Sequence, residues 1–413
     1  MPLFKIGYTI LLSVLVCFAC NHQETDIAEQ DFVPLSNTEL TQESSTNTIS
    51  RRGKLRSANR LSSIYTSTSL DTFSFPIIDE ATLTALQRQR RLLKVSRKRH
   101  NQRVGNLQIS RSDLNGTIDI LERWQHLIPI GIEEELEAHQ LRGSDRKGNV
   151  KFTAYFSPIV KVSKNKTSKY KYPILSKPKG FEGTLPSRRQ IEQGALDTVT
   201  YPIAYAASKA DIYYMQLQGS AYVEYPNGKR ELLSYDGENN HPYRSIETYL
   251  IKHKSDFGIR NVSMEGIKDF LYQKPHLADT ILNHNPSFTF FRRGQKLPTG
   301  AGHVPLSEDI SIAVDKRYIP LGSCLLAAVP VVDEKGVVVR HEYKVLMAQD
   351  VGGAIKGTGH VDLYFGAGAA AQQRANSFNH YGRLWLLLPK KENSNQDFAA
   401  RAVLVNHSPS NTF

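Results

Sequence analysis

DVGGAIKGTGHVDLYFG, residues 350–366, places Asp350 and Asp362 on either side of a glycine-rich segment whose only other charged side chain is Lys356. Glycine loses more backbone freedom on folding than any other residue, so five glycines here indicate tight turns or close backbone approach. The apolar run KVLMAQD before the glycines and the alternating HVDLYFG after them are typical of β strands. The stretch therefore predicts two strands joined by a glycine loop, with a carboxylate at each end.

Asp362 occupies one face of the second predicted strand. It shares that face with His360 and Tyr364, and the residues between them are apolar and face the opposite side. A carboxyl group held in partly apolar surroundings has its pKa raised, as a general acid near neutral pH requires. An aspartate beside a turn at the protein surface would give the same pattern.

Two further aspartates stand where a predicted strand meets a turn. Asp350 ends the strand before the glycines, and Asp315 lies in SIAVDKRYIPLG. Such positions suit a site, but aspartate is also a common turn residue. The residues alone do not rank the three aspartates.

The 413-residue chain is long enough for two domains. Helical spacing occurs at 79–101 and 113–127, and β texture with frequent Pro and Gly begins at 151. Short helices are expected at 245–254 and 264–273, and an Ala-rich one at 366–378. Residues 21–75 are rich in Ser, Thr, Asn and Gln, which predicts a flexible tether.

The segment IYYMQLQGSAY, residues 212–222, is predicted as a strand. Alternation would place Gln216 and Gln218 on one polar face with a tyrosine, followed by the small pair Gly219 and Ser220. Amides beside an aromatic ring suit sugar hydroxyl and N-acetyl groups. An ordinary half-exposed strand would look the same.

The N-terminus has the pattern of a secretory signal. A short apolar run follows Lys5 and ends at Ala19 and Cys20, before the polar NHQETD. Cys20 is expected to become the lipidated first residue of the mature chain; the alternative is an ordinary cleaved signal. Cys324 is expected to be a buried thiol.

A net charge of +12 with a pI near 9.4 suits nucleic acid, a membrane surface or an acidic polymer as partner. A secreted, anchored protein does not meet DNA, so nucleic acid is excluded as a partner. If Cys17 is removed with the signal and Cys20 is lipidated, only Cys324 remains. The chain has no HExxH motif, phosphate loop or dinucleotide fingerprint. No metal and no cofactor are therefore expected.

Several longer motifs together resemble the membrane-bound lytic murein transglycosylase A family. In chain order they are FTAYFSPIV (152–160), YPILSKP (172–178), LPSRRQIEQGAL (185–196), YYMQLQGSAYV (213–223), SYDGENNHPYRSI (234–246), NPSFTFF (285–291), SIAVDKRYIPLG (311–322), DVGGAIKG (350–357) and VDLYFGAG (361–368). The resemblance covers about residues 152–390.

The resemblance implies a mainly β fold with some α and two domains. A six-stranded double-psi β-barrel would be interrupted by a smaller β-rich domain, with the substrate groove between them. The expected segments are a signal peptide (1–19), a tether (20–75), the barrel domain (76–156 and 294–392), the insert (157–293) and a flexible tail (393–413).

The resemblance also implies roles for individual residues. Asp362 corresponds to the family's catalytic acid, Asp350 to a supporting residue, and Asp315 to a structural one. The groove would be lined by Thr153, Tyr155, Gln216, Gln218, Gly219, Ser220 and Lys356. One departure from the family's pattern is an additional residue between the glycine motif and Asp362, which a glycine loop can absorb.

The implied activity is non-hydrolytic cleavage of peptidoglycan glycan strands between N-acetylmuramic acid and N-acetylglucosamine, giving 1,6-anhydromuropeptides in cell-wall turnover. The expected location is the periplasmic face of the outer membrane, anchored through Cys20, with other cell-wall enzymes as possible partners. Two alternatives are a hydrolase that uses Asp350 as base, and a non-catalytic lipoprotein that binds peptidoglycan.

Overall fold

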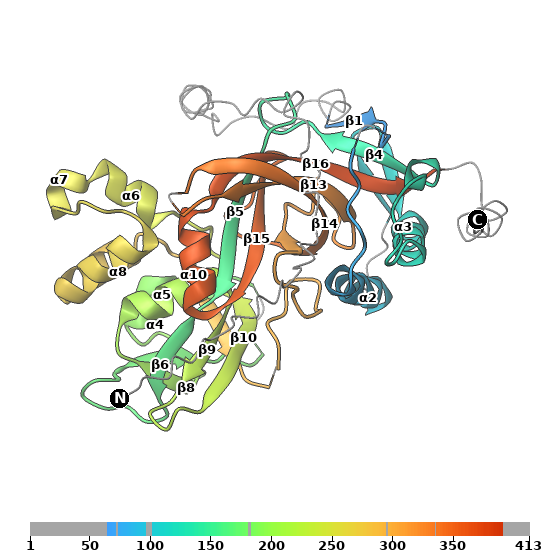
Figure 1. Ribbon diagram of the computed structural model, residues 1–413. Coiled ribbons are helices and arrows are strands. Elements are labelled where there is room, and N and C mark those ends of the chain that lie inside the picture. The colour runs from blue at the N-terminus through green and yellow to red at the C-terminus, as the bar shows by residue number, and fades with distance from the viewer. Residues whose placement is uncertain are drawn as a thin grey trace, which may run out of the picture. The chain divides into compact units, whose positions relative to one another are not determined.

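The computed structural model describes residues 64–390 apart from 72, 96–100, 181–182, 295 and 335. The predicted signal peptide, Cys20, most of the tether and the tail at 393–413 lie outside the described residues. The described part is mainly β, with helices beside two sheets (Figure 1). None of its helices combines the length and apolar character needed to cross a membrane.

The first sheet contains a closed ring of strands. Strands β16, β13, β14, β12, β15 and β5 are each hydrogen-bonded to the next, and β5 pairs again with β16, which closes six strands into a barrel. β4 and β1 extend the sheet from β16. The strands are β1 (Tyr65–Thr68), β4 (Leu136–Leu141), β5 (Val150–Ser157), β12 (Ser311–Ala313), β13 (Cys324–Val332), β14 (Val338–Asp350), β15 (His360–Ala367) and β16 (Asn379–Pro389).

Sequence pattern explains why these segments form a barrel. β13 reads CLLAAVPVV and is buried along nearly its whole length, as expected for a strand covered on both faces. β5 and β15 keep partly exposed polar residues between buried ones. These two strands run parallel, and the polar positions of both face the same side.

Helices cover parts of the barrel domain. α2 (Glu80–Val95) contacts α3 (Arg111–Arg123) and β14, and α3 contacts β16. α3 begins with a capping box in which the Ser110 hydroxyl accepts from the backbone N–H of Asp113. α10 (Gly368–Ser377) lies against β5 and β15. The remaining elements are β2 (Asn101–Val104), β3 (Leu107–Ser110) and η3 (Ile132–Glu134).

The second sheet lies entirely between β5 and β12 in the chain, so the barrel is interrupted by an insert. Its order is β11-β10-β9-β6-β8-β7. The strands are β6 (Ile159–Ser163), β7 (Tyr172–Leu175), β8 (Pro202–Ala206), β9 (Ser220–Glu224), β10 (Arg230–Glu238) and β11 (Thr289–Arg292). The helices are α4 (Arg188–Glu192), α5 (Lys209–Gln218), α6 (Ile246–Lys252), α7 (Lys254–Phe257), α8 (Met264–Gln273), η4 (Pro275–Leu277) and α9 (Ala278–Leu282).

The prediction that residues 212–222 form one strand is wrong. The segment forms most of helix α5, and β9 begins only at Ser220. The Ser208 hydroxyl caps the first turn, and Gly219 ends the helix with a φ of 74°. α5 is buried on several sides, so its apolar residues follow no single helical stripe and mimic strand alternation.

The predicted tether is too long. Tyr65–Thr68 pairs with β4, and Ile64 and Leu70 are buried. The Tyr65 hydroxyl also donates to the carbonyl oxygen of Tyr318 over 2.8 Å. Residues 64–71 therefore belong to the folded barrel domain, which the polar composition of the surrounding sequence concealed.

Candidate active site

Three cross-strand pairs of β5 and β15 bring the candidate residues together. Because the strands are parallel and in register, alternate residues of both strands lie on one face of the sheet. The three pairs on this face are Lys151 with His360, Thr153 with Asp362, and Tyr155 with Tyr364. The register thus places Asp362 at the centre of a ladder of polar and aromatic side chains.

Asp362 has the electrostatic properties of a group that exchanges protons near neutral pH. Burial raises the pKa of its carboxyl to about 7. The charge of Asp350 acts in the same direction, whereas the hydrogen bond from Thr153 and the charge of Lys151 act against it. The residue as a whole is half-buried. Both its acid and its carboxylate forms are therefore accessible at neutral pH.

Asp350, the last residue of β14, is held by three donors. The Tyr155 hydroxyl donates to Oδ2 over 2.9 Å, and the backbone N–H groups of Ala301 and Val351 donate to Oδ1, each over 2.8 Å. Burial raises the pKa of Asp350, and the three hydrogen bonds oppose that rise. The geometry fixes the position of this carboxylate beside Asp362.

Asp315 anchors the glycine loop. Its Oδ2 accepts from the backbone N–H of Gly357 over 2.9 Å, and its Oδ1 accepts from Arg317 Nε over 2.9 Å. Although burial acts in the opposite direction, these bonds to Arg317 and Gly357 lower the pKa of Asp315 to about 2. Asp315 therefore holds the loop between the two other aspartates.

The residues directly before His360 lie in a tightly packed part of the loop. The Thr358 hydroxyl donates to the carbonyl oxygen of Gly143 over 3.1 Å. A Cβ on Gly359 would lie 2.5 Å from Ser144 Oγ, so only glycine fits there without displacement. The backbone N–H of Lys151 bonds the carbonyl oxygen of Gly359 over 2.8 Å. The loop is thus fixed directly before β15 begins, and the strand lies in register with β5.

Comparison with known proteins finds family models and relatives that match this chain. A family model described as the MltA specific insert domain matches residues 151–292, and a 3D domain model matches residues 310–388. Membrane-bound lytic murein transglycosylase A of Escherichia coli K12 is 39% identical over 257 residues, which are 61% of this chain and 69% of the relative. The Vibrio cholerae protein of the same name is 36% identical over 256 residues, with 61% and 69% covered.

The chain belongs to the membrane-bound lytic murein transglycosylase A family. Solved structures agree with this assignment. E. coli MltA with bound chitohexaose has a TM-score of 0.64 and 31% identity, covering 81% of this chain and 95% of that chain. MltA from Neisseria gonorrhoeae has a TM-score of 0.62 and 25% identity, covering 80% and 93%.

Family membership confirms the predicted fold class and enzyme class. The chain has the sheet-rich two-domain architecture of the MltA structures, and its relatives are peptidoglycan-cleaving lyases by name. The relatives are described as membrane-bound, so the family to which the chain belongs is membrane-associated.

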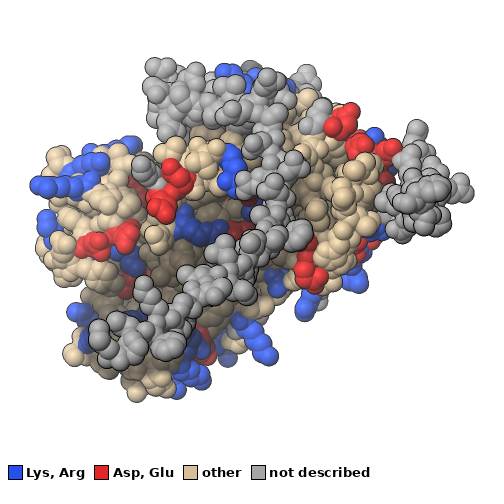
Figure 2. Space-filling model, viewed as in Figure 1, with Lys and Arg blue, Asp and Glu red and all other residues tan. Residues whose placement is uncertain are grey.

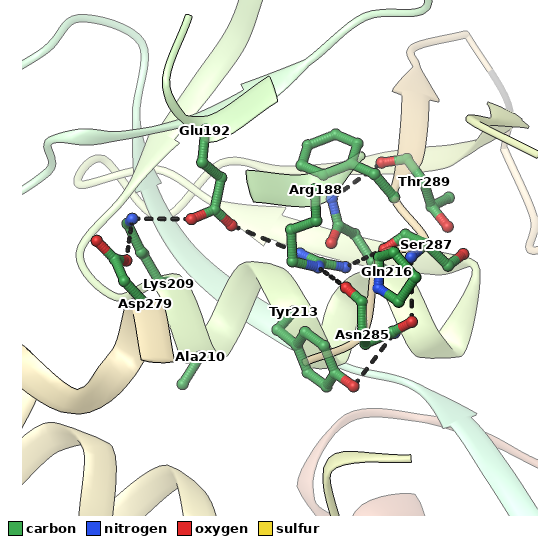
Figure 3. Close-up of polar contacts among 12 residues, drawn as sticks. Arg188, Glu192, Lys209, Ala210, Tyr213, Gln216, Asp279, Asn285, Ser287 and Thr289 are labelled. Atoms are coloured by element: carbon green, nitrogen blue, oxygen red, sulfur yellow. Dashed lines mark hydrogen bonds and ion pairs between the residues drawn. The ribbon is translucent and has the colours of Figure 1, made fainter. Parts of the chain in front are cut away.

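The residues predicted to line the groove fall into different surroundings. Gln216 is buried, and its Nε2 donates to the carbonyl oxygen of Thr289 over 3.0 Å (Figure 3). Gln218 Oε1 accepts from the backbone N–H of Phe156 over 3.0 Å. Ser220 is also buried, with its hydroxyl 3.1 Å from that of Ser157. Gln218 and Ser220 thus bond to the end of β5, whereas the structure does not bring Gln216 to Asp362.

A buried polar network stabilises the insert around Gln216. Arg188 donates to the carbonyl oxygens of Asn285 and Ser287 over 3.1 and 2.7 Å, and its guanidinium lies 4.7 Å from the Tyr213 ring centroid (Figure 3). Asn285 also donates to the Tyr213 hydroxyl over 3.3 Å. These contacts join α4, α5 and the segment before β11, so the motif residues of this region serve packing.

Three of the other predicted residues lie on or near the site. The Thr153 hydroxyl donates to Asp362 Oδ1 over 2.7 Å, and Tyr155 bonds Asp350, so both support the carboxylates. Lys356 is exposed, and the buried Ile355 before it packs with Tyr155 in a small apolar cluster.

On the face of the molecule shown in Figure 2, Lys and Arg side chains are interspersed with Asp and Glu side chains.

The sequence patterns did not single out His360 and Lys151 as site residues. His360 Nε2 lies 2.8 Å from Thr153 Oγ1, and the charge of Lys151 acts on both His360 and Asp362. Alternation along HVDLYFG does place His360 on the face of Asp362. The parallel pairing that adds Lys151 and Thr153 is a long-range contact that local patterns do not contain.

Proposed function

We propose that the chain cleaves the β-1,4 bond between N-acetylmuramic acid and N-acetylglucosamine in peptidoglycan glycan strands, without water, to give 1,6-anhydromuropeptides. The observation that carries the proposal is Asp362, a half-buried residue whose carboxyl pKa is raised to about 7 beside a second, fixed carboxylate. The relatives' names and the chitohexaose complex of E. coli MltA support a glycan substrate.

In the proposed reaction Asp362 acts first as acid and then as base. Its protonated carboxyl donates to the glycosidic oxygen as the bond from that oxygen to C1 of the muramoyl residue breaks. The resulting carboxylate accepts the proton of the C6 hydroxyl while O6 forms a bond to C1. Asp362 ends protonated, as it began. The 2-acetamido group of the muramoyl residue would shield the cationic centre between the two steps.

A single carboxyl suffices because the nucleophile belongs to the substrate. An intramolecular hydroxyl has a high effective concentration at C1. Glycoside hydrolases of the two-carboxylate type need a second carboxylate as nucleophile or as base toward water. Here Asp350 accepts three hydrogen bonds, which occupy three of its roughly four acceptor positions. That arrangement supports an electrostatic role for Asp350, in which its charge raises the pKa of Asp362.

The domain assignment is part of the proposal. We assign residues 157–293 to the insert, and 294–392 with the segment that ends at 156 to a double-psi barrel, with the groove between them. The closed ring of six strands and the insert sheet at residues 159–292 support this division. Lys356, exposed on the glycine loop, is proposed to contact the glycan.

The location is also proposed in detail. Lipidation of Cys20 would anchor the chain to the outer membrane, with the enzyme facing the periplasm and the peptidoglycan. The pattern of the N-terminal sequence and the description of the relatives as membrane-bound support this assignment.

Product analysis tests the proposed reaction. Purified sacculi are digested with protein lacking residues 1–20, and the released muropeptides are analysed by mass spectrometry. The proposal predicts products with 1,6-anhydromuramic ends. Reducing ends would instead support the hydrolase alternative, with Asp350 as base. A protein that binds sacculi but releases the same small amount of material as its Asp362→Asn variant would support the non-catalytic alternative.

A further inference from the structure

We propose that His360 is a positioning residue that acts through Thr153 to fix which oxygen of Asp362 carries the catalytic proton. The inference rests on the proposed function of Asp362 as acid and base. Its structural basis is a chain of two short hydrogen bonds: His360 Nε2 to Thr153 Oγ1 at 2.8 Å, and Thr153 Oγ1 to Asp362 Oδ1 at 2.7 Å.

The direction of the chain follows from the donors available. The Thr153 hydroxyl has one proton, and it donates that proton to Asp362 Oδ1. The bond between Thr153 Oγ1 and His360 must then use a proton on the imidazole nitrogen. His360 is therefore assigned the tautomer with the proton on Nε2 and none on Nδ1.

This direction serves both steps of the proposed reaction. When Asp362 is ionised it can only accept, so the order His360 to Thr153 to Asp362 is required. When Asp362 is protonated, the same order keeps Oδ1 as an acceptor and leaves the proton on Oδ2, where it can reach the glycosidic oxygen. The opposite direction would turn the acidic proton toward Thr153 and away from the substrate.

The surroundings keep His360 a neutral donor. Burial, and then the charge of Lys151, lower the pKa of His360 to about 4, so the ring is uncharged at neutral pH. A cationic imidazole would favour the ionised form of Asp362 and remove the acid. The other charged or titratable groups that face this region are Lys151 on β5, Asp350 on β14 and Tyr364 on β15. Tyr155 is bonded to Asp350.

The backbone holds the chain of bonds in place. Thr153 and Asp362 are opposite each other in the parallel register, and His360 is two residues before Asp362 on the same face. Packing of Gly359 against Ser144 fixes the residue directly before His360. The Thr153 side chain is thereby held between His360 and Asp362 and bonds both of them.

The tautomer can be measured without reference to activity. Imidazole ¹⁵N chemical shifts of the full folded protein at pH 7 are assigned by the signals lost in His360→Gln. We expect the His360 signals of a neutral ring with hydrogen on Nε2. A proton on Nδ1, or a ring charged at pH 7, would overturn the proposal and would leave the proposed cleavage reaction intact.

Kinetics test whether His360 acts through Thr153. His360→Leu is expected to lower kcat roughly three- to tenfold with little change in KM, because one aligning hydrogen bond is lost. His360→Gln, which keeps an N–H donor, is expected to recover most of that loss. In a Thr153→Val background, His360→Leu is expected to have little further effect, because its target is gone.

His380→Leu is the matched control, since His380 lies in the same barrel and bonds the carbonyl oxygen of Ser377. We expect it to keep wild-type kcat. Equal losses from His360→Leu in the wild-type and Thr153→Val backgrounds would overturn the proposal, as would full activity of His360→Leu. Hydrolytic products from the wild-type protein would instead contradict the proposed function.

Discussion

The Tyr155 hydroxyl donates a 2.9 Å hydrogen bond to Asp350 Oδ2 and so joins the middle of β5 to the end of β14. Tyr155 is buried, and two backbone N–H groups hold the other oxygen of Asp350. The second carboxylate of the site is therefore fixed by protein donors and acts on Asp362 through its charge. The first prediction follows from that charge.

Asp350→Asn is expected to lower the pKa of Asp362, because a neighbouring negative charge that raises it is removed. The protonated form of Asp362 is the acid in the proposed reaction. Activity of the variant should therefore begin to fall at a lower pH than that of the wild-type protein, and kcat at neutral pH should fall about tenfold or more. The measurement is the pH profile of kcat/KM between pH 5 and 9.

Asp309→Asn is the control for this profile, since Asp309 forms an ion pair with Arg374. Among the described residues, no hydrogen bond or ion pair joins the Asp309 side chain to Asp362 or Asp350. Its alkaline limb should match that of the wild-type protein. If Asp350→Asn moved the alkaline limb to higher pH, the electrostatic role given to Asp350 would be wrong.

Asp362→Asn is expected to stabilise the fold at alkaline pH while abolishing cleavage. The folded pKa of Asp362, about 7, lies above its ordinary value of 3.8, so the folded state keeps a proton that the unfolded chain loses between these values. Stability of the wild-type protein thus falls as pH rises through this window. The shift corresponds to about 4 kcal/mol at most, and to about 2 kcal/mol after discounting for solvent access.

Thermal unfolding of both proteins at pH 4.5 and pH 8 checks this expectation. The midpoint of Asp362→Asn should exceed that of the wild-type protein clearly at pH 8 and only slightly at pH 4.5. A stabilisation of equal size at both pH values would contradict a raised pKa for Asp362 in the folded state.

Gly359→Ala is expected to destabilise the barrel by about 1 to 3 kcal/mol and to reduce kcat, because the new Cβ would overlap Ser144 and displace the start of β15. Gly353→Ala is the matched control on the same loop. A Cβ on Gly353 would meet only Tyr243 Cβ at 3.9 Å, an ordinary contact. Urea unfolding of the two variants should separate them, and equal stability would refute the packing explanation for Gly359.

Asp315→Asn is expected to loosen the glycine loop, since the charged acceptor for Gly357 and Arg317 is lost. The folded pKa of Asp315, about 2, lies below its ordinary value of 3.8. The stabilisation from this carboxylate is therefore present above pH 3.8 and is lost as pH falls toward 2. At pH 7 the variant should lose about 1 to 3 kcal/mol of unfolding free energy.

Unfolding experiments on the wild-type protein and Asp315→Asn at pH 7 and pH 3 measure how their difference in unfolding free energy changes with pH. It should be smaller at pH 3. A constant difference between the two pH values would show that the ionisation of Asp315 does not contribute to stability.

Local sequence patterns predicted those parts of the fold that local chemistry determines. The helical spacing at 79–101 and 113–127 predicted α2 and α3, which the structure places at Glu80–Val95 and Arg111–Arg123. The same approach failed for α5, where burial on several sides removes the helical stripe and only Ser208 and Gly219 mark the ends. It also failed for β1, because Tyr65–Thr68 becomes a strand only by pairing with β4.

The candidate site was predictable to a similar extent. Alternation in β15 identified Asp362 and its face, and the family resemblance ranked it above Asp350 and Asp315. The hydrogen bonds that tune the site cross between strands: Thr153 lies 209 positions from Asp362, and Tyr155 lies 195 positions from Asp350. Such contacts depend on closure of the barrel, which no local pattern encodes.

The central claim, a single catalytic carboxyl in non-hydrolytic cleavage, is tested most directly by comparing products of the wild-type protein with those of Asp362→Asn and Asp350→Asn on the same sacculi, by mass spectrometry. The account predicts anhydro ends from the wild-type protein, the same products formed more slowly by Asp350→Asn, and none from Asp362→Asn, which should still bind sacculi. Reducing ends from the wild-type protein, or undiminished anhydro products from Asp362→Asn, would contradict it.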